Sequence, residues 1–289
     1  MSAGTLALVL AGAVCHALWN ILAKRAAGGP LFVWLFGCVS MAAAAPVALW
    51  TWWTHPQTFD VWMWMAALTS GLVHVVYSLV LQQGYRVSDF AVVYPVARGT
   101  GPLMSVLGAV VLLSEVPSVL GWLGVAMVLG GVFMTAGALD ILRGGDASRR
   151  RLGVLWGVLT GLCIACYTVI DGWAVKSLGM VPVLFYAVGL LFRTLLLAPW
   201  ALRRSAALRT QWQQQRTAIL LVGLLSPLAY SLVLFAVQTA PLSYVAPVRE
   251  ISMLIGTALG ARLLNESLRP SQAMGAAMML LGVAGLALA

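Results

Sequence analysis

This chain contains ten apolar runs joined by short loops. Each run is about 20 residues long, which is enough to span a bilayer as a helix. Because lipid cannot hydrogen-bond to exposed backbone groups, such runs must form helices, and their unbroken apolar character excludes a transmembrane β-barrel. Hydrophobic residues make up 62% of the 289 residues and charged ones only 9%, which excludes a water-soluble domain. We therefore predict an all-α integral membrane protein with ten transmembrane helices. The predicted spans lie near residues 3–23, 31–53, 61–82, 90–113, 118–138, 152–172, 181–201, 217–238, 243–264 and 271–289.

The second half of the chain repeats the first at an offset of 151 residues, the distance from Arg98 to Arg249. The same offset aligns Glu115 with Glu266. Five spans per copy is an odd number, so the second copy must enter the membrane in the opposite direction. We therefore predict two inverted five-helix repeats, residues 1–140 and 152–289, joined by a basic linker at residues 141–151. The offset also aligns Cys15 with Cys166, Gly124 with Gly275 and Gly131 with Gly282.

Basic residues lie in the loops at one side of the predicted membrane. Thirteen lysines and arginines fall in the loops after odd-numbered spans, whereas the loops after even-numbered spans contain Lys176 alone. Basic residues in such loops orient the protein in the membrane and contact anionic lipid, which accounts for the net charge of +9. No nucleic-acid partner is therefore expected. The bias predicts a multi-pass protein of the cell inner (plasma) membrane, with the odd loops in the cytoplasm and both termini outside.

Glycine-rich faces mark the last span of each repeat. Glycines let helix backbones approach closely, so the fifth and tenth spans are expected to pack together or to form a homodimer. Glu115 and Glu266 follow the fourth span of each repeat and are expected to satisfy helix ends and neighbouring loops rather than to touch a substrate. The glycines are Gly121, Gly124, Gly130, Gly131, Gly275 and Gly282.

The chain resembles the drug/metabolite transporter superfamily, specifically its EamA-type ten-helix members. The resemblance lies in the two five-helix copies, the acidic residue after the fourth span of each copy and the glycine-rich closing helix. One subgroup has motifs similar to H-A-x-W-N, here from His16 to Asn20, and Y-P-x-A-R-G, here from Tyr94 to Gly99. The resemblance implies a central substrate cavity that the fourth and ninth helices help to line. Family members usually have basic residues after the second span, where this chain reads THPQTFD. Either this chain is inserted the other way up, or the predicted number of spans is off by one.

Three arginines, Arg98, Arg193 and Arg249, fall inside apolar spans. A buried guanidinium must meet a carboxylate, backbone carbonyls, water or an anionic substrate. We expect Arg98 and Arg249 to bind the carboxylate or phosphorus–oxygen group of a small substrate, because the guanidinium fork suits such groups. Alternatively, each arginine clamps a broken helix by capping carbonyls near Pro95, Pro102 or Pro247.

Two acidic residues inside spans are candidates for proton coupling. Glu250 is the first candidate and Asp171 the second, unless Glu250 pairs permanently with Arg98 or Arg193. Glu250 is next to Arg249, but on a continuous helix it points about 100° away, so the two side chains are not expected to face the same way.

Polar and aromatic residues in other spans complete the predicted substrate site. His16, Trp19 and Asn20 share one helix face, and His16 aligns with Tyr167 in the second repeat. Aromatic rings with a polar group are suited to the wall of a ligand pocket. The remaining predicted pocket residues are His74, Tyr77, Tyr94, Tyr230 and Tyr244.

The residues favour a secondary transporter or exchanger of a small anionic or zwitterionic metabolite, such as an amino acid, carboxylate, phosphonate or organophosphate, working by alternating access. An exporter of drugs or amphipathic compounds is one alternative, and the surplus of buried arginine speaks against cationic substrates. A lipid-carrier flippase is another. The chain has no paired carboxylates, metal cluster, nucleophile constellation or phosphate-binding loop, so we expect no enzyme, catalytic residue, metal or cofactor.

Overall fold

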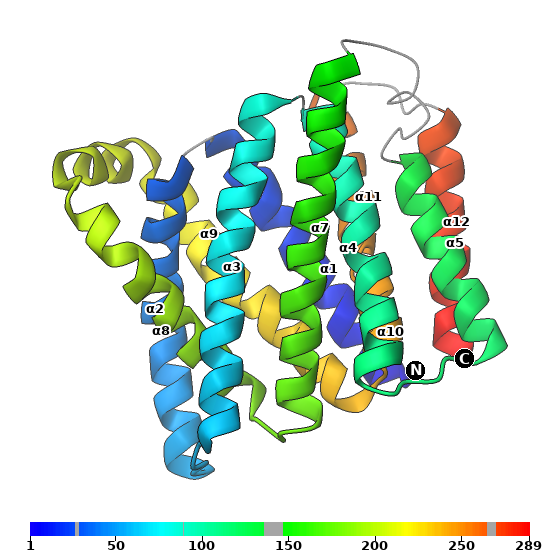
Figure 1. The fold of residues 1–289 in the computed structure, drawn as a ribbon, viewed down its shortest axis with the longest axis horizontal. Helices are drawn as coiled ribbons and strands as arrows, with labels where there is room; N and C mark the ends of the chain where they lie inside the picture. The colour runs from blue at the N-terminus through cyan, green and yellow to red at the C-terminus, as the bar shows by residue number, and fades with distance from the viewer. Residues whose placement is uncertain (27–28, 89, 136–146, 265–269) are drawn as a thin grey trace.

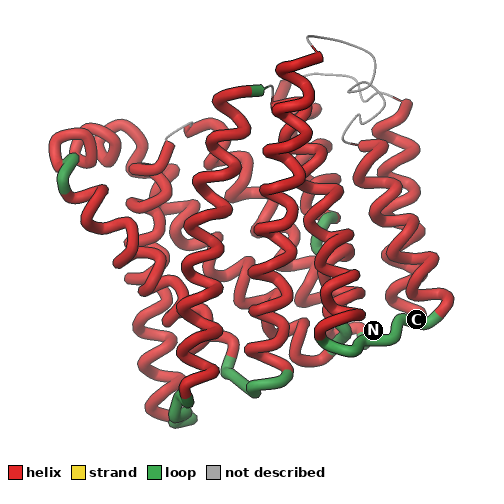
Figure 2. The backbone as a smooth tube through the Cα atoms, viewed as in Figure 1, coloured by secondary structure: helices red, strands yellow, loops and turns green. Residues whose placement is uncertain are grey.

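The structure is a computed structural model that describes residues 1–26, 29–88, 90–135, 147–264 and 270–289. Figure 2 shows that the described chain is a bundle of helices with short loops at its two ends. The helices are α1 (Ala3–Ala26), α2 (Gly29–Thr54), α3 (Val61–Val87), α4 (Phe90–Leu112), α5 (Val119–Thr135), α7 (Ala147–Lys176), α8 (Pro182–Leu202), α9 (Ser205–Thr239), α10 (Leu242–Val248), α11 (Ile251–Leu264) and α12 (Pro270–Leu288).

These helices correspond to the predicted membrane spans. Eight of them are long and apolar enough to cross a bilayer, and α5 is a shorter apolar helix of 17 residues. The ninth predicted span is divided into α10 and α11, which together have the length of one crossing. The prediction of an all-helical membrane protein is confirmed within the described residues.

The two halves of the chain run in opposite directions through the bundle. The two termini lie at the same end of the bundle, whereas α5 ends and α7 begins at the other end (Figure 1). The helix pairs also match when the halves are exchanged: α1 packs on α9 as α3 packs on α7, and α1 packs on α11 as α4 packs on α7. In the same way, α5 packs on its own counterpart α12, and α2 on α8. This is the packing of two inverted repeats.

Glycines bring α5 and α12 into backbone contact, as the sequence predicted. A Cβ atom added to Gly131 would lie 2.5 Å from the carbonyl oxygen of Gly275, and one added to Gly282 would lie 2.7 Å from that of Gly124. Only glycine fits at such distances. The two glycine faces therefore pack against each other within one chain.

The ninth span is interrupted at Arg249 and Glu250, between α10 and α11. Pro247 lacks the N–H that would continue the helical ladder. Just beyond it, the Glu250 amide bonds to the Pro247 carbonyl at 2.9 Å, and the Ser252 amide bonds to the Arg249 carbonyl at 3.1 Å. These are the three-residue steps of a tight turn rather than α-helical steps. The repeat counterpart α4 continues as a helix through Arg98, so the repeats differ at this position.

Glu115 holds the start of α10. Its carboxylate accepts hydrogen bonds from the backbone amides of Leu242 and Ser243 at 2.8 and 2.9 Å, and from the Ser243 hydroxyl at 2.7 Å. The Lys176 ammonium, at the end of α7, lies 2.8 Å away. Partial burial raises the pKa of the Glu115 carboxyl, but the bonds from Lys176, Ser243 and Leu242 outweigh burial and bring the pKa below its ordinary value. The predicted role of Glu115 at a helix end is confirmed, and Glu266 lies outside the described residues.

Candidate functional site

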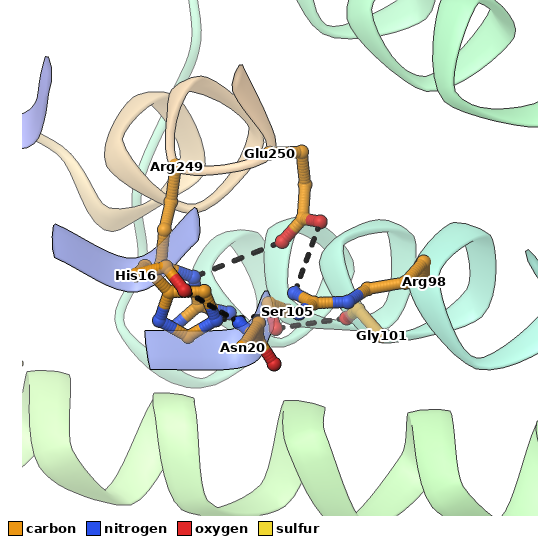
Figure 3. Close-up of polar contacts among 7 residues, drawn as sticks. All are labelled: His16, Asn20, Arg98, Gly101, Ser105, Arg249 and Glu250. Carbon is orange, nitrogen blue, oxygen red and sulfur yellow. Dashed lines mark hydrogen bonds and ion pairs between the residues drawn. The ribbon is translucent and has the colours of Figure 1, made fainter. Parts of the chain in front are cut away.

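Four polar side chains from three parts of the chain meet inside the bundle, and we call them the arginine cluster: Arg98, Arg249, Glu250 and His16 (Figure 3). Arg98 is on α4, His16 is on α1, and the other two lie at the junction of α10 and α11. Arg98 Nη1 is 3.3 Å from Glu250 Oε2, and Arg249 Nε is 3.8 Å from Glu250 Oε1. Two guanidiniums therefore share one carboxylate.

The expectation that Glu250 points away from Arg249 is wrong. It assumed a continuous helix, on which adjacent side chains diverge by about 100°. Because the helix is interrupted at these two residues, both side chains reach toward the same space (Figure 3). Of the two partners expected for Glu250, the structure supplies Arg98 and not Arg193.

His16 accepts a hydrogen bond from Arg98. A guanidinium only donates, so the 3.2 Å contact between Arg98 Nη2 and His16 Nε2 places the ring proton of a neutral His16 on Nδ1. Trp19 meets the His16 ring edge-on with centroids 4.9 Å apart, and Asn20 Nδ2 donates to the His16 carbonyl oxygen at 2.7 Å. On the other side, Arg98 Cζ lies 5.4 Å from the centre of the Tyr94 ring, a cation–π contact.

Arg249 has a side-chain N–H, on Nε, without an acceptor in the described part of the chain. Its side chain is 4% exposed. Glu250 Oε1 is buried and has no donor among the same residues. At 3.8 Å these two atoms attract each other electrostatically without a hydrogen bond. Neither Arg98 nor Arg249 donates to a backbone carbonyl in the described part of the chain, so the carbonyl-capping alternative finds no support there.

A second polar group, the aspartate cluster, consists of Asp171 on α7, Ser70 and His74 on α3, and Tyr230 on α9. Asp171 is 1% exposed. Its Oδ1 accepts a hydrogen bond from Ser70 Oγ at 2.5 Å, and its Oδ2 accepts one from the Tyr230 hydroxyl. Within the residues that the structure describes, Asp171 forms no ion pair. Neutral hydroxyls therefore hold this carboxyl, in contrast to Glu250.

Tyr167 lies between the two clusters. It is on α7, one helical turn from Asp171, and its ring stacks on His74 with centroids 4.0 Å apart. It also meets Tyr77 at 5.9 Å and Tyr230 at 6.4 Å. Its helix α7 also packs along α4, the helix of Arg98. The predicted pocket residues on α3, α7 and α9 thus form one aromatic group.

A small cavity lies against the aspartate cluster, between α3, α7, α8 and α9. The centre of a water molecule can occupy about 10 Å³ of this cavity, so the cavity has room for about one water. Arg193 and Tyr186 on α8 line it. A second cavity, about 20 Å³ on the same measure, shares His74 and Arg193 with the first and lies between α2, α3 and α8.

Two predicted pocket residues, Arg193 and Tyr244, belong neither to the arginine cluster nor to the aromatic group. Arg193 lines the cavity at the aspartate cluster instead, beside Tyr186. The Tyr244 hydroxyl accepts a hydrogen bond from the Ser118 amide at 3.1 Å, so Tyr244 ties α10 to the start of α5. Helix rotation decides both placements.

Sequence reasoning missed Ser70 and Tyr186. Ser70 precedes His74 by four residues and so shares its face of α3, a spacing that could have identified it. Tyr186 had no signal beyond a polar ring in an apolar span.

The sequence model of the EamA-like transporter family matches this chain twice, over residues 4–137 and 151–288. Solved structures share the fold. One of them, described only as "Crystal structure of protein", superposes with a TM-score of 0.73 at 16% sequence identity, and the match covers 100% of this chain and 98% of the other. At that identity the likeness concerns the fold alone. No curated protein matches the sequence.

The two matched segments together span almost the whole chain, and they correspond to the two halves of the helix bundle. The chain therefore belongs to the EamA-like transporter family and is a multi-pass membrane transporter of the drug/metabolite transporter superfamily.

Proposed function

We propose that this transporter moves a small anionic or zwitterionic metabolite and that the arginine cluster binds its carboxylate or phosphorus–oxygen group. The observation that carries the proposal is Arg249, a buried guanidinium whose Nε has no acceptor among the described residues. An oxyanion of the substrate would accept hydrogen bonds from this fork at little cost, because the protein has already removed the guanidinium from water.

The charge of the cluster favours the same class of substrate. Arg98 and Arg249 contribute two positive charges, Glu250 contributes one negative charge, and His16 is neutral because it accepts from Arg98. One positive charge remains inside the bundle. A substrate anion would neutralise it, whereas a cation would add to a charge that is already costly in a membrane interior.

The position of the cluster supports transport by alternating access. Arg98 belongs to the first repeat and Glu250 to the second, so their contact joins the two inverted halves. A substrate that binds between the halves would interact with both during a rocking motion, as in other transporters built from inverted repeats.

Thermal stabilisation of the purified protein by a panel of compounds tests the proposal. The panel contains amino acids, carboxylates, phosphonates, phosphate esters, amines and cationic dyes. A compound present at about 100 times its dissociation constant stabilises the folded protein by about 2.7 kcal/mol. We expect an anion or zwitterion to raise the unfolding temperature. The same compound should bind Arg249→Lys about 10- to 100-fold more weakly, because lysine cannot form the bidentate contact.

The control is Arg86→Lys, the same substitution at an exposed arginine at the end of α3, which should leave the stabilisation unchanged. Equal stabilisation of wild type and Arg249→Lys would contradict the anion site. Stabilisation by cationic dyes or lipids alone would favour drug export or lipid flipping instead.

We further propose that both termini lie outside the cytoplasm. The end of α3 and the start of α7 lie at the end of the bundle opposite the termini (Figure 1), and these helix ends carry Arg86 and Arg149. The positive-inside rule assigns such basic helix ends to the cytoplasmic side. A membrane-impermeant maleimide applied to intact cells should label His55→Cys and leave Ser148→Cys unlabelled. These exposed positions follow α2 and begin α7, at opposite ends of the bundle. The native chain gives the background, since all four of its cysteines lie within helices, and the reverse labelling pattern would reverse the orientation.

A further inference from the structure

The two buried carboxyls of the membrane helices have different surroundings. Glu250 lies between two guanidiniums, with which it forms ion pairs. Asp171 is held by the hydroxyls of Ser70 and Tyr230 and forms no ion pair with a described residue. A carboxyl with only neutral partners can gain and lose a proton without leaving an uncompensated guanidinium behind.

Water-sized space is present next to Asp171. The cavity against the aspartate cluster has room for about one water and is lined by Asp171 itself, together with Ser70, His74 and Tyr230. The neighbouring cavity shares His74 and Arg193 with it. A water molecule in this cavity could exchange a proton with Asp171 directly.

The hydrogen bonds around Asp171 fit the ionised form better than the protonated one. His74 Nδ1 lies 2.9 Å from the Ser70 carbonyl oxygen, which only accepts, so Nδ1 carries a proton and cannot accept from the Ser70 hydroxyl 3.4 Å away. Once Asp171 is protonated, its own O–H needs an acceptor, and Ser70 or Tyr230 must turn its hydroxyl elsewhere. Protonation thus weakens either the contact of α7 with α3, which joins the two repeats, or its contact with α9 within the second repeat.

A physical connection runs from this carboxyl to the arginine cluster. Tyr167 is one turn from Asp171 on α7 and stacks on His74. The same helix α7 packs along α4, which carries Arg98. If a proton on Asp171 changes how α7 packs, it changes the affinity of the arginine cluster for an anion, and by reciprocity an anion changes the affinity of Asp171 for a proton.

We propose that Asp171 is the proton-binding site of this transporter and that its charge is linked through α7 to anion binding at the arginine cluster. The linkage rests on the proposed function, whereas proton binding by Asp171 does not. The titratable and charged groups around Asp171 are His74 on α3, Tyr186 and Arg193 on α8, Tyr230 on α9, Arg249 before α11, and Cys166 and Tyr167 on α7 itself; Tyr77 on α3 contacts Tyr167. From α4, which also packs on α7, the charged group is Arg98.

Infrared difference spectroscopy on the full-length protein in vesicles of phosphatidylcholine and phosphatidylglycerol tests proton binding without any substrate. We expect a carboxylic-acid carbonyl band that emerges as the pH is lowered and that is lost in Asp171→Asn. The matched control is Asp60→Asn, the same substitution at the exposed N-cap of α3, which should keep that band.

Tyr230→Phe provides a second reading if Asp171→Asn does not fold. It removes a hydrogen bond that the ionised carboxylate accepts, so the midpoint of the band should move to higher pH by about one unit or more. A wild-type spectrum without such a band, a band that persists in Asp171→Asn, or a midpoint unmoved by Tyr230→Phe would overturn the proposal.

The linkage is tested separately, with the anion that stabilises the protein most in the thermal panel. That anion should shift the midpoint of the wild-type band and leave it in place in Arg249→Lys. If no anion stabilises the protein, the proposed function fails while the band still decides the proton site. If anions bind but leave the wild-type midpoint unchanged, the proposed function stands and the linkage is overturned.

Discussion

Arg98 Nη1 lies 3.3 Å from Glu250 Oε2, so the arginine of the first repeat pairs with the residue that follows its own counterpart, Arg249, in the second. The two repeats therefore contribute unequally to one site. The first supplies a guanidinium from a continuous helix, whereas the second supplies a guanidinium and a carboxylate from a broken one. The broken helix is what lets one carboxylate serve both arginines.

Replacing Glu250 by Gln should destabilise the protein strongly. The change leaves Arg98 and Arg249 buried without their carboxylate, and removal of one partner from a buried ion pair costs about 3–5 kcal/mol. Thermal unfolding of the purified variant measures this loss. Arg98→Met in the Glu250→Gln background should regain part of it, since one unpaired charge is then removed. An unfolding temperature equal to that of wild type would show that the shared carboxylate is not needed to hold the guanidiniums.

The contribution of Glu115 to stability should depend on pH. Its folded-state pKa lies below the ordinary value of 4.5, so the ionised form is stabilised by folding. Its contribution is complete above pH 4.5 and is lost as the pH falls through the lower folded-state pKa.

The measurement is the difference in unfolding temperature between wild type and Glu115→Gln across pH. Loss of the carboxylate that caps α10 should cost about 1–2 kcal/mol near neutral pH, and most of this comes from the backbone bonds because the Lys176 pair is partly exposed. The difference should shrink below pH 4.5. A difference that is constant with pH would indicate that the charge of Glu115 does not matter.

Gly131→Ala should destabilise the contact between α5 and α12. The new methyl group would lie 2.5 Å from the Gly275 carbonyl oxygen, which is backbone and cannot turn aside, and overpacking of this kind costs about 1–3 kcal/mol. Gly130→Ala is the matched control on the same helix, because its methyl group meets only the flexible end of Met278 and improves helix propensity. Thermal unfolding should rank Gly131→Ala below wild type and Gly130→Ala at or above it; equal effects would argue against close backbone packing.

Much of the fold could be predicted from the sequence. In lipid, an apolar run of sufficient length has to be a helix, so hydropathy alone gave spans that agree with α1 to α12. The glycine faces of α5 and α12 could be predicted to pack because few other arrangements use aligned glycines.

The candidate site could be predicted only as a set of residues. Arg98, Arg249 and His16 do meet, and Tyr167, His74, Tyr77 and Tyr230 do form one aromatic group. Arg193, however, lines the cavity at the aspartate cluster instead of joining the arginine cluster, and Tyr244 bonds to Ser118. The cost of burying polar groups identifies residues that need a partner without saying which partner they find.

The sequence by itself determined that the chain crosses the membrane as helices, that its halves are repeats, and that charge is buried at Arg98, Arg249, Asp171 and Glu250. These properties depend on the length and composition of local segments. Only the tertiary structure decided that Glu250 is shared by two arginines whereas Asp171 is held by Ser70 and Tyr230. Such pairings depend on how each helix is rotated and on where the ninth span breaks, and these are set by packing among distant parts of the chain.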